Sequence, residues 1–289
     1  MASGITEDVV DTARVRFGYA RTGTGPPVVL VPGSGGWRLT FEALAARLST
    51  SHTVYAIDPP GQGATRVTDG SFGYDVDAVT HAIAALLDAL GLAEVAVVGH
   101  SWGGGFAARL AQLHPDRVTR LALLAPAGLD VPDVWEFRLL RLPIVGELAL
   151  RLTSTASVRH MVRKSFAHRA RVPEHLIADA ARALRSGPDA AGLRRDLLAT
   201  ERSVTWAQTE RDLRLVRCPT LIVWGERDRY FPARSIQRFT GHLPSADVQL
   251  VPGAGHSVHD DRPDEVTPRL VQFLADPPLC PEESPVGRR

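Results

Sequence analysis

Cysteine is scarce in this chain of 289 residues, which contains only Cys218 and Cys280. One pair cannot supply the disulfide framework of a small secreted domain. The chain opens MASGITEDVV, with acidic residues where a secretory signal has a basic start and an apolar stretch. We therefore expect two reduced thiols and a cytoplasmic protein.

Net charge is nearly absent too, because 33 basic side chains stand against 32 acidic ones. Lys164 is the only lysine. Nucleic acids and anionic membranes attract proteins with an excess of positive charge, so we expect neither as a partner. No apolar run approaches the roughly 20 residues that span a bilayer. With 44% hydrophobic residues, the chain can bury a large core and carry an inserted subdomain.

Strand and helix patterns alternate along much of the chain. Residues 13–20 alternate apolar and polar positions, which predicts a half-solvated strand. Nearly continuous apolar runs predict strands buried on both faces at 27–32, 53–58, 94–99, 118–126, 219–225 and 246–253. The clearest helix is predicted at 74–92, where apolar residues recur every three or four positions and Gly91 follows. This alternation predicts an α/β fold with a mostly parallel twisted sheet flanked by helices, whose functional loops follow the carboxyl ends of the strands.

The alternation stops between 129 and 217, where Leu, Ala and Arg recur at helical spacing. About ninety residues without a strand exceed what one crossover needs, so we expect an inserted helical cap and a return crossover there. The core then comprises 1–128 and 218–275. The proline-rich and charged residues 276–289 predict a disordered tail.

A serine between glycines follows one of the predicted buried strands, in VVGHSWGGG at 97–105. The G-x-S-x-G pattern of Gly99, Ser101 and Gly103 is weak evidence alone, because glycine and serine are common. Its context is specific, since a strand precedes it and a helical pattern follows it, as in a nucleophile elbow. The two glycines would allow tight packing, and Ser101 would project from the turn as a nucleophile.

A serine nucleophile needs a base, because its hydroxyl holds its proton at neutral pH. His256 follows the last predicted strand, and Asp228 follows the strand before it. The order Ser, Asp, His is that of this type of site, with His256 as base and Asp228 orienting it. Asp130, after the strand at 118–126, is an alternative acid, and we favour Asp228.

The developing oxyanion of an acyl-transfer reaction needs two donors. The backbone N–H of Trp102 is one candidate. The other is the N–H of Ser34 in the GSGG loop after residues 27–32, whose hydroxyl would offer a third donor.

These segments together resemble the α/β-hydrolase superfamily over most of residues 13–275. CPTLIVWGERDRYFP, LVPGAGHS and RLVQFL are similar to capped hydrolases such as meta-cleavage-product hydrolases and haloperoxidase-like esterases. DPPGQGAT matches the family's Asp-x-x-Gly-x-Gly loop through Asp58, Gly61 and Gly63. Ser101 differs from the aspartate nucleophile of dehalogenases and epoxide hydrolases in the superfamily. Pro32 departs from the histidine that many relatives have before the oxyanion loop.

Other residues have simpler interpretations than catalysis. His259, with Asp260 and Asp261, does not have the ligand spacing typical of zinc sites, so we expect no metal and no cofactor. His100 should pack behind the elbow. Trp135, Phe137 and Trp206 would either line a substrate pocket or form the core of the cap.

The leading hypothesis is a serine hydrolase that cleaves an ester-like carbonyl in a small, moderately hydrophobic substrate through an acyl-enzyme. The resemblance also implies two alternatives: a carbon–carbon bond hydrolase of the meta-cleavage type, or a non-hydrolytic ligand-binding or lyase member of the fold. The meta-cleavage enzymes typically have tryptophan after the catalytic histidine, whereas Ser257 follows His256 here. This difference favours esters.

Overall fold

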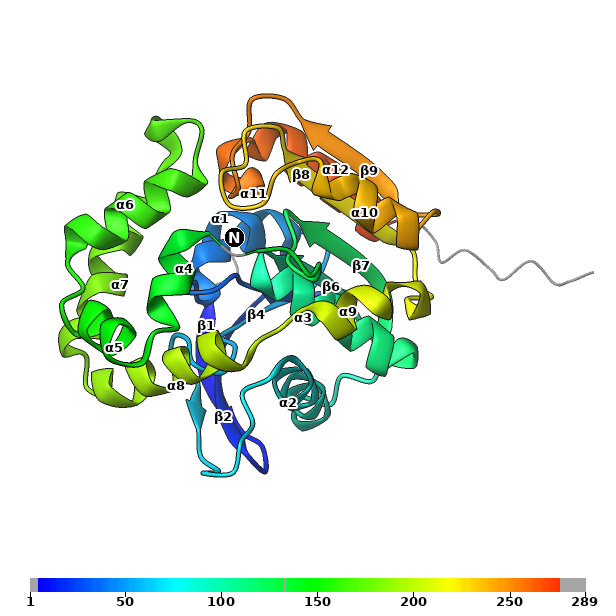
Figure 1. Cartoon of the computed structure of the whole chain (residues 1–289). Coiled ribbons are helices and arrows are strands. Elements are labelled where there is room, and N and C mark those ends of the chain that lie inside the picture. Colours follow the sequence, from blue (N-terminus) through cyan, green and yellow to red (C-terminus); the bar gives the residue numbers. More distant parts are fainter. Residues whose placement is uncertain (1–4, 133, 276–289) are drawn as a thin grey trace, which may run out of the picture.

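The computed structural model describes residues 5–132 and 134–275, so Cys280 and the predicted tail lie outside the described residues. One nine-stranded sheet forms the centre of the described molecule (Figure 1). Its strands lie in the order β1-β2-β4-β3-β6-β7-β8-β9, and β5 pairs with β2. The bounds are β1 Thr6–Asp11, β2 Val15–Thr22, β3 Pro27–Val31, β4 Thr53–Ile57, β5 Arg66–Val67, β6 Val95–His100, β7 Val118–Leu124, β8 Thr220–Gly225 and β9 Asp247–Val251.

Neighbouring strands pair in parallel along β4-β3-β6-β7-β8-β9, whereas β2 pairs antiparallel with β1, β4 and β5. This confirms the mostly parallel sheet. The prediction of burial on both faces is wrong for the last strand. Val248 and Leu250 of β9, which is an edge strand, are 37% and 48% exposed, and Val251 is the one buried residue of this strand. β1 was not predicted, and five of its six residues are exposed.

Helices cover both faces of the sheet, and alternate residues of β3 show how. Val29 and Val31 belong to one buried cluster with residues of α2 and α3, whereas Val28 and Leu30 belong to another with residues of α1 and α12. Successive side chains of a strand point to opposite faces, so both faces of β3 are buried, as expected for a central strand of a parallel sheet. The flanking helices are α1 Glu42–Leu48, α2 Val76–Ala89, α3 Trp102–Leu113, α10 Ser235–His242, α11 Val258–Asp261 and α12 Pro263–Ala275. Short 3-10 helices span Arg38–Phe41, Pro115–Arg117, Arg169–Arg171 and Leu213–Leu215.

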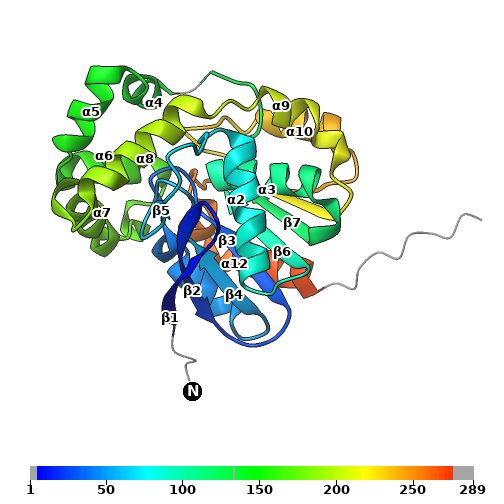
Figure 2. The same ribbon diagram turned by 90° about the horizontal axis from the view of Figure 1, so that it is seen from below.

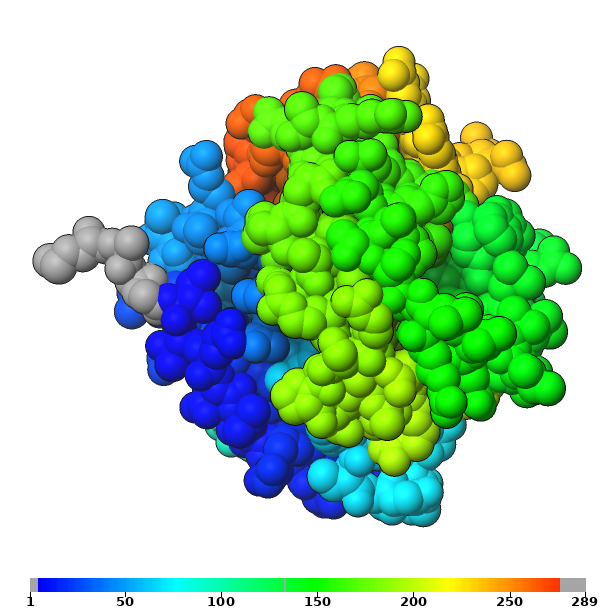
Figure 3. All heavy atoms as spheres, turned by 90° about the vertical axis from the view of Figure 1, so that its left-hand side faces the viewer, coloured from blue at the N-terminus to red at the C-terminus, as the bar shows by residue number. Residues whose placement is uncertain are grey.

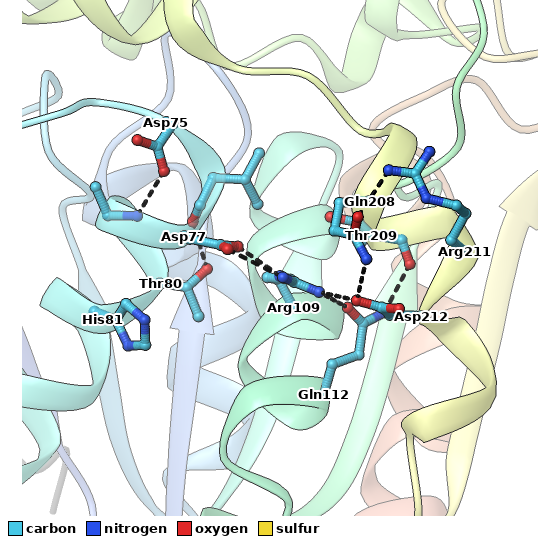
Figure 4. A network of polar contacts seen from close by, with 12 residues as sticks. Asp75, Asp77, Thr80, His81, Arg109, Gln112, Gln208, Thr209, Arg211 and Asp212 are labelled. Carbon is cyan, nitrogen blue, oxygen red and sulfur yellow. Dashed lines mark hydrogen bonds and ion pairs between the residues drawn. The ribbon is translucent and has the colours of Figure 1, made fainter.

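A buried arginine fixes α3 against its neighbours (Figure 4). Arg109 is 4% exposed and donates from Nε to Asp77 Oδ1 of α2 at 2.6 Å and from Nη1 to Asp212 Oδ2 at 2.7 Å. Asp212 directly follows α9 (Ala207–Arg211). Charge-assisted pairs of this kind are strong and directional, so α3 is tied to elements on two sides.

The Asp-x-x-Gly-x-Gly loop is organised around a buried carboxylate. Asp58 is fully buried and accepts hydrogen bonds from the backbone N–H groups of Arg38 at 2.6 Å and Ala64 at 2.7 Å. The Arg38 guanidinium adds an ion pair at 2.5 Å. A Cβ on Gly63 would lie 2.1 Å from Asp58 Oδ2, so a side chain there would collide with this carboxylate.

A group of helices enters between β7 and β8 and gathers at one side of the sheet (Figures 1 and 2). We call residues 134–206 the cap. Its helices are α4 Trp135–Leu140, α5 Pro143–Arg151, α6 Thr155–Ser165, α7 Glu174–Ser186 and α8 Ala190–Ser203. They fall within the segment for which the sequence predicts an inserted cap. Among the described residues, no helix has the length and apolarity needed to cross a bilayer.

Candidate active site

The predicted elbow is a strand–turn–helix in the structure. Ser101 lies between β6 and α3 with φ 53° and ψ −122°, a conformation that residues with a side chain rarely adopt. A Cβ on Gly103 would lie 2.0 Å from the Val31 carbonyl oxygen, and one on Gly99 would lie 2.4 Å from that of Gly103. Glycine is therefore required at both positions for β6, α3 and β3 to approach this closely.

Backbone hydrogen bonds hold this turn in place. The Ser101 N–H donates to the Leu124 carbonyl at the end of β7 at 3.0 Å. The Ser101 carbonyl accepts from Gly104 at 2.9 Å and from Ala127 at 2.8 Å. Contacts from the neighbouring strand and the following loop thus stabilise the strained residue.

Asp228 and His256 meet at the ends of β8 and β9. His256 Nδ1 lies 2.8 Å from Asp228 Oδ2, and the Asp228 side chain is fully buried. The other carboxylate oxygen accepts from the N–H groups of Tyr230 at 2.7 Å and Phe231 at 2.9 Å. Three donors thus converge on one buried carboxylate, which orients the imidazole.

This arrangement sets which imidazole nitrogen acts as a base. A carboxylate only accepts, so Nδ1 carries the proton and Nε2 keeps its lone pair. Among the described residues, none forms a hydrogen bond with the Ser101 hydroxyl. Hydrogen bonds between a nucleophile and its base are often long in apo structures and tighten only when substrate binds.

Asp130, the alternative acid, occupies a different environment. It is exposed, its N–H donates to Glu210 Oε2 at 2.8 Å, and its carbonyl accepts from Arg238. Of the two aspartates, Asp228 is the one hydrogen-bonded to His256.

The loop after β3 approaches the elbow closely. A Cβ on Gly33 would lie 2.7 Å from Ser101 Cβ. Trp102 is the first residue of α3, where N–H groups have no intrahelical acceptor. The backbone N–H groups of Trp102 and Ser34 remain the predicted oxyanion donors.

The Ser34 hydroxyl has a partner that the sequence did not reveal. It donates to Glu201 Oε1 at 2.5 Å, and Glu201 is a fully buried residue of α8. The hydroxyl that the sequence offers as a third oxyanion donor is therefore already hydrogen-bonded to a carboxylate of the cap. The two residues are 167 positions apart, and no local motif marks Glu201.

A family model for the alpha/beta hydrolase fold matches residues 26–263. The chain belongs to the α/β-hydrolase family. It is 32% identical, over 86% of its length, to the dihydrolipoyllysine-residue acetyltransferase component of the acetoin cleaving system of Pseudomonas putida, of which it spans 64%. It is 27% identical to a cis-3-alkyl-4-alkyloxetan-2-one decarboxylase of Shewanella oneidensis, covering 89% of this chain and 85% of that protein.

A solved structure with the same fold is 2-hydroxy-6-oxo-6-phenylhexa-2,4-dienoate hydrolase from Rhodococcus, with a TM-score of 0.80. The match covers 94% of this chain and 99% of that one, at 19% identity. This likeness shows the fold of the α/β hydrolase described here.

Two further histidines of this hydrolase, His100 and His259, lie close to His256. His100 donates from Nε2 to the His256 carbonyl at 3.1 Å, and its ring centroid lies 4.9 Å from that of His259. Burial, followed by the charge of neighbouring imidazoles, holds the pKa of His100 well below its usual value. Burial also lowers the pKa of His259.

Within 5–132 and 134–275, no three His, Cys, Asp or Glu side chains are grouped to hold a metal ion.

The three aromatic residues predicted for a pocket or a cap core have different positions. Trp206 is 7% exposed and packs against Trp102 with ring centroids 5.9 Å apart, so it belongs to the core. Phe137 lies 6.2 Å from Trp102 and 6.0 Å from Tyr230, beside the site. Trp135 is 61% exposed and faces solvent.

An ion pair of the cap also lies beside the site. Lys164 Nζ is 2.5 Å from Glu136 Oε1 and 4.7 Å from the centroid of the Tyr230 ring. The Tyr230 ring lies 5.0 Å from His256, and its hydroxyl donates to the Met161 carbonyl at 3.0 Å. Tyr230 therefore links α6 to the loop that holds Asp228, a role that no sequence motif indicated.

Proposed function

We propose that this α/β hydrolase cleaves an ester-like carbonyl substrate through an acyl-enzyme on Ser101, without a cofactor. The observation that carries the proposal is the buried Asp228–His256 hydrogen bond of 2.8 Å beside a serine elbow. Nucleophile, orienting acid and base would come from the loops that follow β6, β8 and β9, and this set of groups can carry out acyl transfer.

In the proposed reaction, His256 Nε2 accepts the Ser101 proton as Oγ attacks the carbonyl carbon. The negative charge that develops on the carbonyl oxygen is stabilised by the N–H groups of Trp102 and Ser34. His256 then returns the proton to the leaving alcohol, and the carbon–oxygen bond of the ester breaks. A water molecule, deprotonated by His256, releases the acid and restores Ser101. Asp228 keeps the imidazole oriented and stabilises its charged form.

The surroundings support a small, moderately hydrophobic substrate. Phe137 and Tyr230 bring apolar rings to the site, and Phe231 contacts His256 with centroids 5.4 Å apart. A second candidate is hydrolysis of a carbon–carbon bond in a dienoate, since the similar Rhodococcus structure is that of a 2-hydroxy-6-oxo-6-phenylhexa-2,4-dienoate hydrolase. Ser257 after His256 supplies no aromatic wall for such a dienoate.

A direct comparison of two substrates tests the ester assignment. We expect short-chain aryl esters to be cleaved with a kcat/KM at least about tenfold above that of a 2-hydroxy-6-oxo-dienoate, or about 1.4 kcal/mol of transition-state discrimination. Both rates are measured on one preparation by absorbance. Faster dienoate cleavage that still requires Ser101 would replace the ester by the carbon–carbon substrate. Slow single turnover of every ester would favour a binding protein.

A further inference from the structure

An exposed apolar surface covers two cap helices. Residues of α4, α5 and the segments next to them expose most of the large hydrophobic side chains that reach solvent in the described molecule. We call them the α4–α5 apolar surface: Trp135, Leu139, Leu142, Ile144, Val145, Leu148 and Leu152. Ile144 is 82% exposed and Leu152 is 70% exposed. Such a concentration within 18 consecutive positions marks an interaction site rather than ordinary surface.

The same helix pair already has a buried side. Leu150 of α5 is 6% exposed and clusters with Leu197 and Leu198 of α8. A Cβ on Gly146 would lie 3.1 Å from Leu198 Cδ2, so α5 packs closely on α8. The exposed side chains are therefore additional to those that hold the cap together. A helix that is apolar on its outer side as well as its inner side is suited to contact with an external apolar phase.

The charge of this part of the chain indicates the kind of partner. The cap contains thirteen Arg and Lys residues and seven Asp and Glu residues, whereas the whole chain is nearly neutral. Within residues 134–152 themselves, three arginines stand against two glutamates, of which Glu136 is buried and pairs with Lys164. Arg138 and Arg151 are exposed and neither forms an ion pair with another described residue, whereas Glu147 lies 3.9 Å from Arg202. The exposed charge of this surface is therefore mainly that of unpaired arginines, which favours an anionic partner over a second copy of the same surface.

We propose that the α4–α5 apolar surface docks this protein on the surface of an anionic lipid bilayer. Leucine, isoleucine and valine side chains would enter the boundary of the acyl chains, and Trp135 suits the interface. The arginines would extend to lipid phosphates while their stems remain in apolar contact. The cap side of the molecule faces the viewer in Figure 3, and the green segment that contains α4 and α5 is open on it. The net charge near zero predicts no membrane partner, but the positive charge is concentrated in the cap.

Vesicle sedimentation tests the proposal without any substrate. The wild-type chain is mixed with vesicles of phosphatidylcholine alone, or of equal parts phosphatidylcholine and phosphatidylglycerol. We expect binding to the mixed vesicles that weakens as salt rises from about 0.1 M to about 1 M, because the Debye length falls from roughly 10 Å to 3 Å. A double variant, Ile144→Asp with Leu148→Asp, should bind at least about tenfold more weakly.

A matched control is Val9→Asp with Leu250→Asp, since these side chains are 54% and 48% exposed but lie outside the cap. The control should bind as the wild type does. Arg138→Gln with Arg151→Gln should lose the preference for phosphatidylglycerol, and it leaves the apolar side chains intact. Absence of wild-type binding to either vesicle would overturn the proposal. So would equal binding by the Ile144→Asp, Leu148→Asp variant, or a dimer in solution that this variant dissociates.

Discussion

At the scale of single residues, Ser101 combines strain with support. A non-glycine residue in so sparsely populated a conformation costs about 1–3 kcal/mol. Hydrogen bonds to Leu124, Gly104 and Ala127 hold the turn despite that cost. Strain maintained by the surrounding structure is typical of functional positions, which is why the elbow supports a catalytic role more strongly than its three-residue pattern does.

The two candidate acids give a prediction with a built-in control. Asp228→Asn should lower kcat for ester hydrolysis by about 10³-fold or more, because an amide in place of Oδ2 no longer stabilises the charged imidazole or fixes its tautomer. Asp130→Asn, an equivalent change at an exposed aspartate, should leave kcat within about twofold of wild type. Steady-state kinetics on both variants provide the measurement, and the reverse ranking would assign the acid to Asp130.

Residue roles could be predicted where a motif or a strand end marks them. His256 and Asp228 each follow a recognisable apolar run, so the sequence places them at one edge of the sheet. Glu201 and Tyr230 carry no such mark. Their partners, Ser34 and Met161, lie far away in the chain, and only the packing of the cap on the core brings them together.

At the scale of secondary-structure elements, burial decides which strands are recognisable. The central strands are continuous apolar runs because both of their faces are covered. β1 has the sequence TEDVVD and is mostly exposed. Its acidic residues give no apolar pattern from which a strand could be predicted, and the strand forms by antiparallel pairing with β2. For β9 the sequence predicts too much burial, because its hydrophobic side chains resemble those of a central strand although β9 lies at the edge of the sheet.

Contacts between elements also predict a pH dependence of stability. His100 ends β6, and burial lowers its pKa well below the usual 6.5. Above pH 6.5 the residue is neutral in both the folded and the unfolded chain. Below that pH only the unfolded chain takes up the proton, so the free energy of unfolding should fall as the pH falls, by up to about 1.4 kcal/mol per pH unit for this group.

Urea denaturation between about pH 5 and pH 7.5 measures this effect, which lies on the acid side of the ordinary histidine pKa. His100→Asn removes the titrating ring, so the variant should lose less stability on acidification than the wild type does, whatever its stability at neutral pH. His160→Asn serves as the control, because His160 is exposed in α6. Identical pH slopes for the wild type and His100→Asn would contradict the account.

At the scale of the whole molecule, polar contacts from the cap reach the core at both sides of the site. Glu201 binds the Ser34 hydroxyl in the loop after β3, and fully buried Asp196 accepts from the Tyr74 hydroxyl at 2.7 Å. Tyr230 connects the opposite side to α6. The fold class follows from the alternation of strands and helices, whereas the way the cap closes on the core depends on these distant pairs.

The central claim is that Ser101 carries the acyl group during hydrolysis. The most direct measurement is mass spectrometry of the protein quenched during turnover of an aryl ester, with peptide mapping of the modified residue. We expect the acyl mass on the peptide that contains Ser101. Ser101→Ala should remain folded, acquire no acyl mass and lose about 10⁴-fold or more of the hydrolysis rate. An acyl group on another residue, or a Ser101→Ala variant that keeps a tenth of the rate, would contradict the account.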